Sequence, residues 1–112
     1  MSIISTDIQK AISLLENEKL VAIPTETVYG LAGNIFSEKA IQQIFTTKKR
    51  PHFNPLIVHI HSLEALKNIV SYVPEKAKKL AEAFWPGSLT LVLPKKNTIP
   101  DLITAGKNTV AV

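Results

Sequence analysis

The 112-residue sequence contains no cysteine, which excludes a disulfide framework and a thiolate metal site. No apolar run approaches the roughly 20 residues that a membrane-spanning helix needs. The start, MSIISTDIQK, lacks the basic and long apolar segments of a signal peptide. We therefore expect a cytoplasmic protein with no membrane partner. Hydrophobic residues make up 46% and charged residues 20%, which is typical of one globular domain.

Several catalytic motifs are also missing. There is no G-x-x-x-x-G-K-[ST] phosphate loop, no G-x-G-x-x-G dinucleotide fingerprint and no serine nucleophile elbow. Paired carboxylates suited to glycoside chemistry are absent as well. We accordingly assign no catalytic residue and no metal-binding residue.

Arginine is nearly absent: Arg50 is the only one, against 12 lysines. The net charge is +4, and the positive charge lies beyond Ser37. This excess favours a polyanionic partner. A solvated lysine-rich face is the alternative, especially for the lysines at 76–79 and 95–96.

Hydrophobic periodicity predicts helices that alternate with short strands. One helix should bury Ile8, Ala11, Ile12 and Leu15, and a later one Ala77, Leu80, Ala81 and Phe84. Alternation of this kind indicates an α/β fold with parallel or mixed strand pairing. We expect helices at 5–19, at 37–46, from 62 and from 74, and strands at 20–23, 56–60, 89–94 and 108–112. The last expected strand reaches the end of the sequence. We therefore interpret the 112 residues as the N-terminal portion of a longer domain.

The segment PTETVYGLAG, from Pro24 to Gly33, is rich in hydroxyl groups. Thr25, Thr27 and Tyr29 alternate, so an extended chain would project them to one side. Gly30 and Gly33 would let the backbone approach a ligand closely. The segment is either a pocket for a small polar ligand or a polar loop.

The segment TTKKRPHFNPLIVHIH holds the second group of candidates. Arg50 beside Pro51 offers a planar fork of donors for phosphate oxygens, although a solvated turn is the alternative. His59 and His61 share one face of the expected strand and with His52 could bind zinc. His59 could instead contact substrate or be a hydrogen-bonded structural histidine. In FWPGSLT, Trp85 joins a helix to a strand, and we expect it to be structural.

Four segments, PTETVYGLAG, KKRPHFNPLIVHI, FWPGSLTLVL and TAGKNTVAV, resemble in order and spacing the motifs of the YrdC-like threonylcarbamoyl-AMP synthases. The resemblance covers nearly the whole chain. It implies a YrdC-like α/β fold, a twisted mixed sheet with helices packed on it, around a positively charged concave face. It also implies condensation of L-threonine, bicarbonate and ATP, with Mg²⁺, to threonylcarbamoyl-AMP and pyrophosphate.

The product of that reaction serves threonylcarbamoyl-adenosine modification of tRNA, so the resemblance also implies tRNA and other tRNA-modification proteins as partners. Residue by residue, it implies an L-threonine site of Thr25, Tyr29 and His59. It implies an ATP site of Lys48, Arg50, Asn54 and Thr109.

The sequence departs from the family pattern at three places. Lys49 stands where the family often has glycine, and Ser88 replaces the second proline of W-P-G-P-L-T. An arginine after V-A-V and a Ser-Ala-Asn segment, which help to build the family's pocket, do not occur before Val112. We therefore expect the 112 residues alone to be inactive.

A non-catalytic module of the same fold that binds double-stranded RNA or tRNA is the alternative function. Binding of that kind would depend steeply on salt. The joint presence of Thr25, Arg50 and His59 favours the enzyme, because an RNA surface recognised by shape needs none of them.

Overall fold

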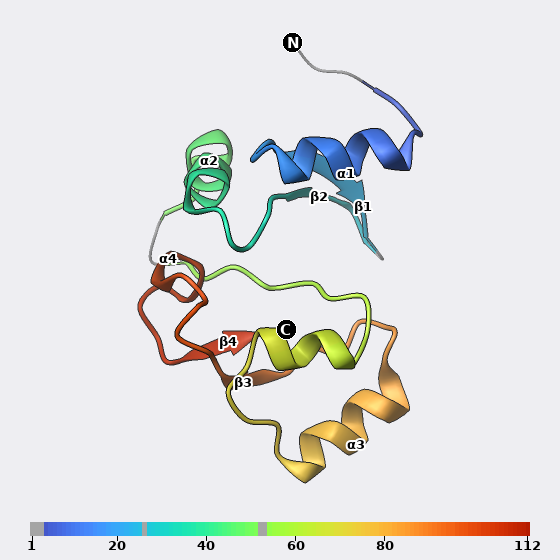
Figure 1. Ribbon diagram of the computed structural model, residues 1–112, viewed down its shortest axis with the longest axis vertical. Helices are drawn as coiled ribbons and strands as arrows, with labels where there is room; N and C mark the ends of the chain where they lie inside the picture. Colours follow the sequence, from blue (N-terminus) through green and yellow to red (C-terminus); the bar gives the residue numbers. More distant parts are fainter. Residues whose placement is uncertain (1–3, 26, 52–53) are drawn as a thin grey trace. The chain divides into compact units, whose positions relative to one another are not determined.

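The computed structural model describes residues 4–25, 27–51 and 54–112, and the chain divides into two compact units, Met1–Lys49 and Arg50–Val112 (Figure 1). The first unit contains α1 (Ile8–Glu16), β1 (Val21–Pro24), β2 (Tyr29–Ala32) and α2 (Glu38–Lys48). The second contains the 3₁₀ helix η1 (Glu64–Asn68), α3 (Glu75–Phe84), β3 (Val92–Pro94), α4 (Asp101–Thr104) and β4 (Thr109–Ala111).

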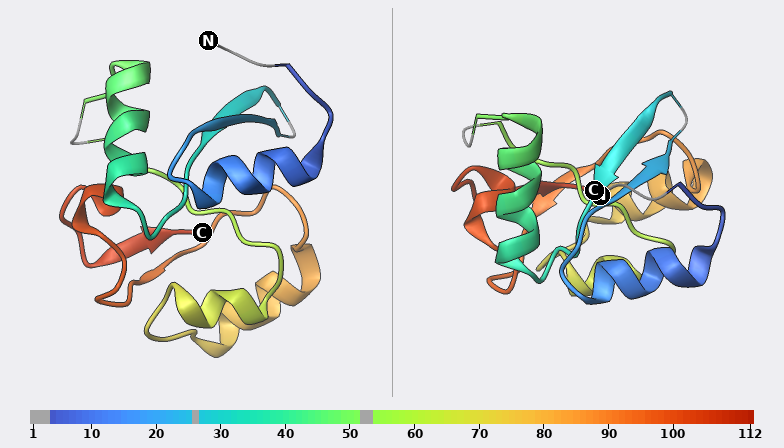
Figure 2. Two further views of the ribbon diagram at one scale, coloured as in Figure 1. Left: turned by 45° about the horizontal axis from the view of Figure 1, so that its top comes forward. Right: turned by 90° about the horizontal axis from the view of Figure 1, so that it is seen from above.

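In the first unit, β1 and β2 form an antiparallel hairpin whose register runs from Val21 opposite Ala32 to Pro24 opposite Tyr29. The sequence predicted β1 but did not predict β2. The hairpin contacts α1, which lies along it (Figure 2). The hydroxyl-rich segment therefore spans one strand end, a turn and a second strand.

Helix α2 forms where the sequence predicted a helix. The Ser37 hydroxyl caps its start by accepting a hydrogen bond from the Ala40 N–H at 3.1 Å. Its buried residues are those expected: Ala40, Ile41, Ile44 and Phe45. The helix ends at Lys48, and the residue that follows it, Lys49, has a left-handed backbone with φ of 54°.

Helix α1 differs from its prediction in burial. The Asp7 carboxylate caps it by accepting from the Gln9 and Lys10 N–H groups. The apolar stripe is not buried, however, because Ile8 is 72% exposed and no residue of α1 lies in the core. A two-stranded hairpin is too narrow to cover the whole stripe.

The second unit holds the two-stranded sheet of β3 and β4, and isolated bridges beside it make the strand pairing mixed, as predicted. Strands β3 and β4 are antiparallel, with Val92 opposite Ala111. Ile57 makes a parallel bridge to Ala111, and Val70 makes an antiparallel bridge to Lys95. The strand predicted at 56–60 is reduced to the Ile57 bridge, reinforced by the Val58 N–H bonded to the Ala111 carbonyl at 2.9 Å.

One face of this sheet supplies the core of the second unit. Residues from the sheet, from η1 and its continuation, and from α3 and α4 are buried: Val58, Leu66, Ile69, Val70, Ala77, Ala81, Leu91, Leu93, Ile99, Ile103, Val110 and Val112. On the opposite face, Ile57, Val92 and Thr109 are exposed. We call this opposite side the open face.

Helix α3 buries less than the sequence predicted. Ala77 and Ala81 are buried, whereas Leu80 is 43% and Phe84 59% exposed. Figures 1 and 2 show α3 beside η1, and only the two small side chains of its stripe are covered, while the larger ones remain outside. None of the helices in the described residues is long and apolar enough to cross a membrane.

Candidate functional site

In the first unit, the Thr25 hydroxyl organises the hairpin turn. It donates to the Val28 carbonyl and accepts from the N–H groups of Thr27 and Val28 at 3.4 and 3.3 Å. The expectation that Thr25, Thr27 and Tyr29 alternate along an extended chain is therefore wrong, because the backbone bends at 27–28. The hydroxyl proton of Thr25 serves the turn, and a ligand would have to compete for it.

Tyr29 begins β2 opposite Pro24, and its side chain is exposed. The two glycines of the segment differ. A Cβ on Gly30 would make ordinary contact with Thr25 at 3.5 Å, whereas one on Gly33 would lie 3.1 Å from Leu20 and 3.2 Å from Ile44. The close contact at Gly33 is with side chains of the same unit, so a side chain there would have to displace Leu20 or Ile44 slightly.

Lys48, the other candidate of this unit, is the last residue of α2 and is exposed. A cation in the last turn interacts favourably with the partial negative charge at the end of a helix. The side chain is accessible to an anionic ligand.

In the second unit, Arg50 is half-buried and holds the backbone that follows it. Its Nη2 donates to the Pro55 carbonyl at 2.8 Å, and its Nε donates to the Asn54 carbonyl at 3.4 Å. The Asn54 N–H in turn donates to the Pro51 carbonyl at 3.1 Å. A guanidinium has five N–H donors, so three remain for phosphate oxygens. The structure thus brings Arg50 and Asn54 together.

His59 and Thr109 lie on the open face. His59 follows the bridge residue Ile57 by two positions and, like it, is exposed. Thr109 precedes Ala111 by two positions and lies opposite Pro94. Because side chains alternate along strands, both candidates project from one face, on either side of the row that contains Ile57.

Two other expectations concern the histidines and Trp85. His52 lies outside the described residues, and His61 is exposed. No group of three or more His, Cys, Asp and Glu side chains in the described part of the chain could hold a metal ion. Trp85 is half-buried and donates from Nε1 to the Leu89 carbonyl at 2.8 Å, which supports its expected structural role.

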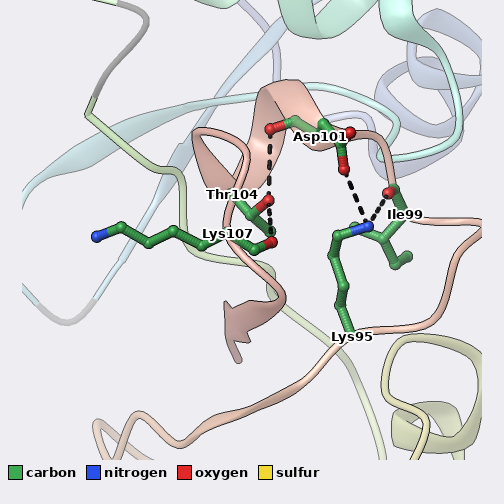
Figure 3. Close-up of polar contacts among 5 residues, drawn as sticks. All are labelled: Lys95, Ile99, Asp101, Thr104 and Lys107. Atoms are coloured by element: carbon green, nitrogen blue, oxygen red, sulfur yellow. Dashed lines mark hydrogen bonds and ion pairs between the residues drawn. The ribbon is translucent and has the colours of Figure 1, made fainter.

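The sequence did not predict that the connection between β3 and β4 would be held by its own side-chain hydrogen bonds and an ion pair. Figure 3 shows that Lys95 Nζ contacts the Asp101 carboxylate at 3.1 Å and the Ile99 carbonyl at 3.0 Å. The Thr104 hydroxyl bonds within the same connection. No sequence pattern indicated that Thr104 of the TAGKN segment would be buried.

The chain is similar to several known proteins. The family described as "Telomere recombination", which groups Sua5, YciO and YrdC, matches residues 13–112. The threonylcarbamoyl-AMP synthase of Pyrococcus abyssi is 52% identical over 105 residues, and that of Bacillus subtilis is 47% identical over 106. In each case the match covers 94% of this chain and 31% of the relative. The chain therefore spans about a third of the length of these relatives.

Solved structures show the same fold. The structure of P. abyssi Sua5 complexed with L-threonine superposes on this chain with a TM-score of 0.91 at 52% sequence identity. The superposition covers 94% of this chain and 31% of the Sua5 chain. Escherichia coli YciO superposes with a TM-score of 0.79 at 20% identity, over 93% of this chain and 50% of YciO. The YciO likeness concerns the fold alone.

Proposed function

The chain belongs to the Sua5/YciO/YrdC family, and from this premise we propose that it supplies the substrate-binding part of an L-threonylcarbamoyladenylate synthase. The observation that carries the proposal is the similarity to P. abyssi Sua5, which is 52% identical and was solved with L-threonine. The relatives in P. abyssi and B. subtilis are threonylcarbamoyl-AMP synthases. The proposed role in threonylcarbamoyl-adenosine modification of tRNA is what the resemblance to this family implies.

The proposed reaction has two steps. The amine of L-threonine captures bicarbonate to give a carbamate, with loss of water. A carbamate oxygen then attacks the α-phosphorus of ATP, and the bond from that phosphorus to the bridging oxygen breaks as pyrophosphate leaves. No covalent nucleophile is required, so the protein acts by positioning the reactants, by neutralising charge and by excluding water.

The candidate residues suit these tasks. We assign Thr25, Tyr29 and His59 to L-threonine, since hydroxyls and an imidazole offer neutral donors and acceptors to a zwitterion. We assign Lys48, Arg50, Asn54 and Thr109 to ATP, in which the cations neutralise the polyphosphate. Mg²⁺ would enter with ATP, because the described residues provide no acidic cluster of their own for it.

Pyrophosphate release tests this proposal. ATP, bicarbonate and Mg²⁺ are incubated with and without L-threonine, first with the 112-residue chain. They are then incubated with a hybrid in which the chain replaces the matching segment of the P. abyssi synthase. We expect threonine-dependent release from the hybrid and little from the chain alone, since the chain spans 31% of that synthase. A hybrid that folds, binds neither substrate and releases no pyrophosphate would contradict the proposal.

A double-stranded RNA-binding function is the competing outcome. The lysines Lys76, Lys78 and Lys79 on α3 are exposed and could contact phosphates. RNA binding through them would weaken steeply with salt, whereas binding of L-threonine would change little. Salt-dependent RNA binding without binding of threonine or ATP would favour the module over the enzyme.

A further inference from the structure

The connection between β3 and β4 is hydrogen-bonded between its two ends and contributes buried side chains to the core. The Lys95 N–H donates to the Asn108 carbonyl at 2.9 Å, which joins the two ends of the connection. Between these ends, Ile99 and Ile103 are buried in the core. The Lys95 side chain is only 10% exposed and bonds to Asp101 and Ile99 (Figure 3). The connection therefore has a conformation defined by its own hydrogen bonds and by burial.

Thr104 lies at the centre of this element. It is 2% exposed and is the only buried polar or charged residue among those that the structure describes. Its hydroxyl lies 2.8 Å from the Lys107 carbonyl and 3.3 Å from the Asp101 carbonyl. A hydroxyl has one proton, and the Asp101 carbonyl already accepts from the Gly106 N–H at 2.9 Å. The Lys107 carbonyl is therefore its principal acceptor.

The turn after Thr104 depends on this bond. The Lys107 N–H donates back to the Thr104 carbonyl at 3.1 Å, so the two residues are bonded in both directions. Between them, Ala105 and Gly106 have left-handed backbones, with φ of 54° and 81°. Glycine adopts this region freely, whereas the conformation of Ala105 is unfavourable unless its surroundings hold it. Loss of the hydroxyl should let the turn relax.

Both ends of this turn lead to candidate ATP residues. Downstream, Lys107 and Asn108 are followed directly by Thr109. Upstream, the carbonyl of Ile103 accepts from the Leu56 N–H at 2.8 Å, two residues after Asn54. Arg50 holds the Pro55 carbonyl in between. The Thr104 hydroxyl thus fixes a turn that is connected to both candidate residues. Thr109 follows the turn in the sequence, and the backbone near Asn54 is bonded to the residue that precedes it.

We propose that Thr104 is a positioning residue for the nucleotide, through its bond to the Lys107 carbonyl. The inference rests on the proposed function, because it presupposes that the second unit binds ATP. Thr104 does not touch ATP itself. It sets the backbone positions from which Asn54 and Thr109 make contact.

The test compares Thr104→Val, which keeps the shape and removes the hydroxyl, with Thr104→Ser, which keeps the hydroxyl. Thr98→Val is the matched control, because Thr98 is an exposed threonine of the same connection. Calorimetric titrations measure the Kd of ATP and the Kd of L-threonine for each variant, and thermal melts measure stability. We expect Thr104→Val to weaken ATP about threefold to tenfold, as loss of one hydrogen bond implies. L-threonine affinity should stay within about twofold, and serine should restore ATP binding.

A second variant covers the case in which Thr104→Val folds poorly. Gly106→Ala strains the same turn through its φ of 81° and has open space for the new methyl group. The same selective loss of ATP affinity is expected. Unchanged ATP affinity in folded Thr104→Val or Gly106→Ala, or equal loss of both ligands, would overturn the inference and leave the proposed function intact. Failure of the unaltered chain to bind either ligand would instead overturn the proposed function and the inference together.

Discussion

The two units of the chain stabilise their candidate residues in different ways. Among the residues that the structure describes, the four buried apolar residues of the first unit all belong to α2, whereas the second unit buries twelve, spread over its strands, its helices and the segments between them. Thr25 and Tyr29 lie at the end of a two-stranded hairpin, and Lys48 lies at the end of a helix. Asn54 and Thr109 instead belong to a backbone tied together by Arg50, Ile103 and Thr104.

This difference indicates unequal local stability. Regions with few buried apolar contacts open at low free energy, and binding segments often come from such regions. We therefore expect the hairpin to open at a lower free energy than the second unit.

The largest expected effect tests the difference in apolar burial between the two units. Leu66→Ala in the second unit removes a side chain that is 1% exposed, and it should cost about 2–5 kcal/mol in unfolding free energy. Ile12→Ala on the exposed stripe of α1 should cost about 0.5 kcal/mol or less. Chemical denaturation of both variants checks this, and similar losses in the two would show that α1 is packed as well as η1.

Arg50→Ala should have the next largest effect. It removes charge-assisted bonds worth roughly 1.5–3 kcal/mol, so ATP affinity should fall about tenfold or more while threonine affinity changes less. Calorimetry with ATP measures the loss, and Lys39→Ala, an exposed lysine of α2, is the control.

Arg50→Lys separates the two contributions of this side chain. Lysine keeps the charge but cannot hold the carbonyls of Asn54 and Pro55 in the same fork geometry. Affinity between those of alanine and arginine is expected. An unchanged ATP Kd in Arg50→Ala would rule out the phosphate role.

Thr25→Val should have a smaller effect, confined to the hairpin. The hydroxyl bonds to the backbone of Thr27 and Val28, so its loss should loosen the turn by about 1 kcal/mol. Threonine affinity should fall several-fold and ATP affinity should stay nearly constant. Titrations with both ligands check this, with Thr25→Ser as the variant that keeps the hydroxyl. Equal loss of both ligands would assign Thr25 a purely structural role.

Lys49→Gly should have the smallest effect, and it should be stabilising. A left-handed backbone costs a non-glycine residue roughly 1–2 kcal/mol, partly offset by the greater freedom of glycine in the unfolded chain. We expect a gain of about 1 kcal/mol or less, measured by thermal melts. Ala105→Gly makes the same change in the second unit, and a loss of stability in both variants would contradict this account.

The sequence predicted the elements whose signals are local. Helix α2 has a capping serine and a clear apolar stripe, and its buried residues were the predicted ones. Helix α4 has only four residues, too few to show periodicity, and it was missed. The strand at 56–60 became a bridge because only Ile57 pairs with β4 in a ladder pattern.

The candidate residues were predicted mainly from the family resemblance, whereas their hydrogen bonds were seen only in the structure. No sequence pattern shows that Arg50 donates to the Asn54 and Pro55 carbonyls, or that the Thr25 hydroxyl serves its own turn. These contacts depend on where the backbone bends. Thr104 was invisible for the same reason, since its importance lies in being buried.

The most direct test is an NMR titration of the isotope-labelled 112-residue chain with L-threonine and with Mg²⁺-ATP, observing backbone amides. The account predicts that L-threonine shifts amides around Thr25, Tyr29 and His59, and that ATP shifts those of Lys48, Arg50, Asn54 and Thr109. D-threonine is the control for the first ligand. Absence of shifts with both ligands, or identical shifts with L- and D-threonine, would contradict the claim that this chain carries the substrate-binding part of a threonylcarbamoyl-AMP synthase.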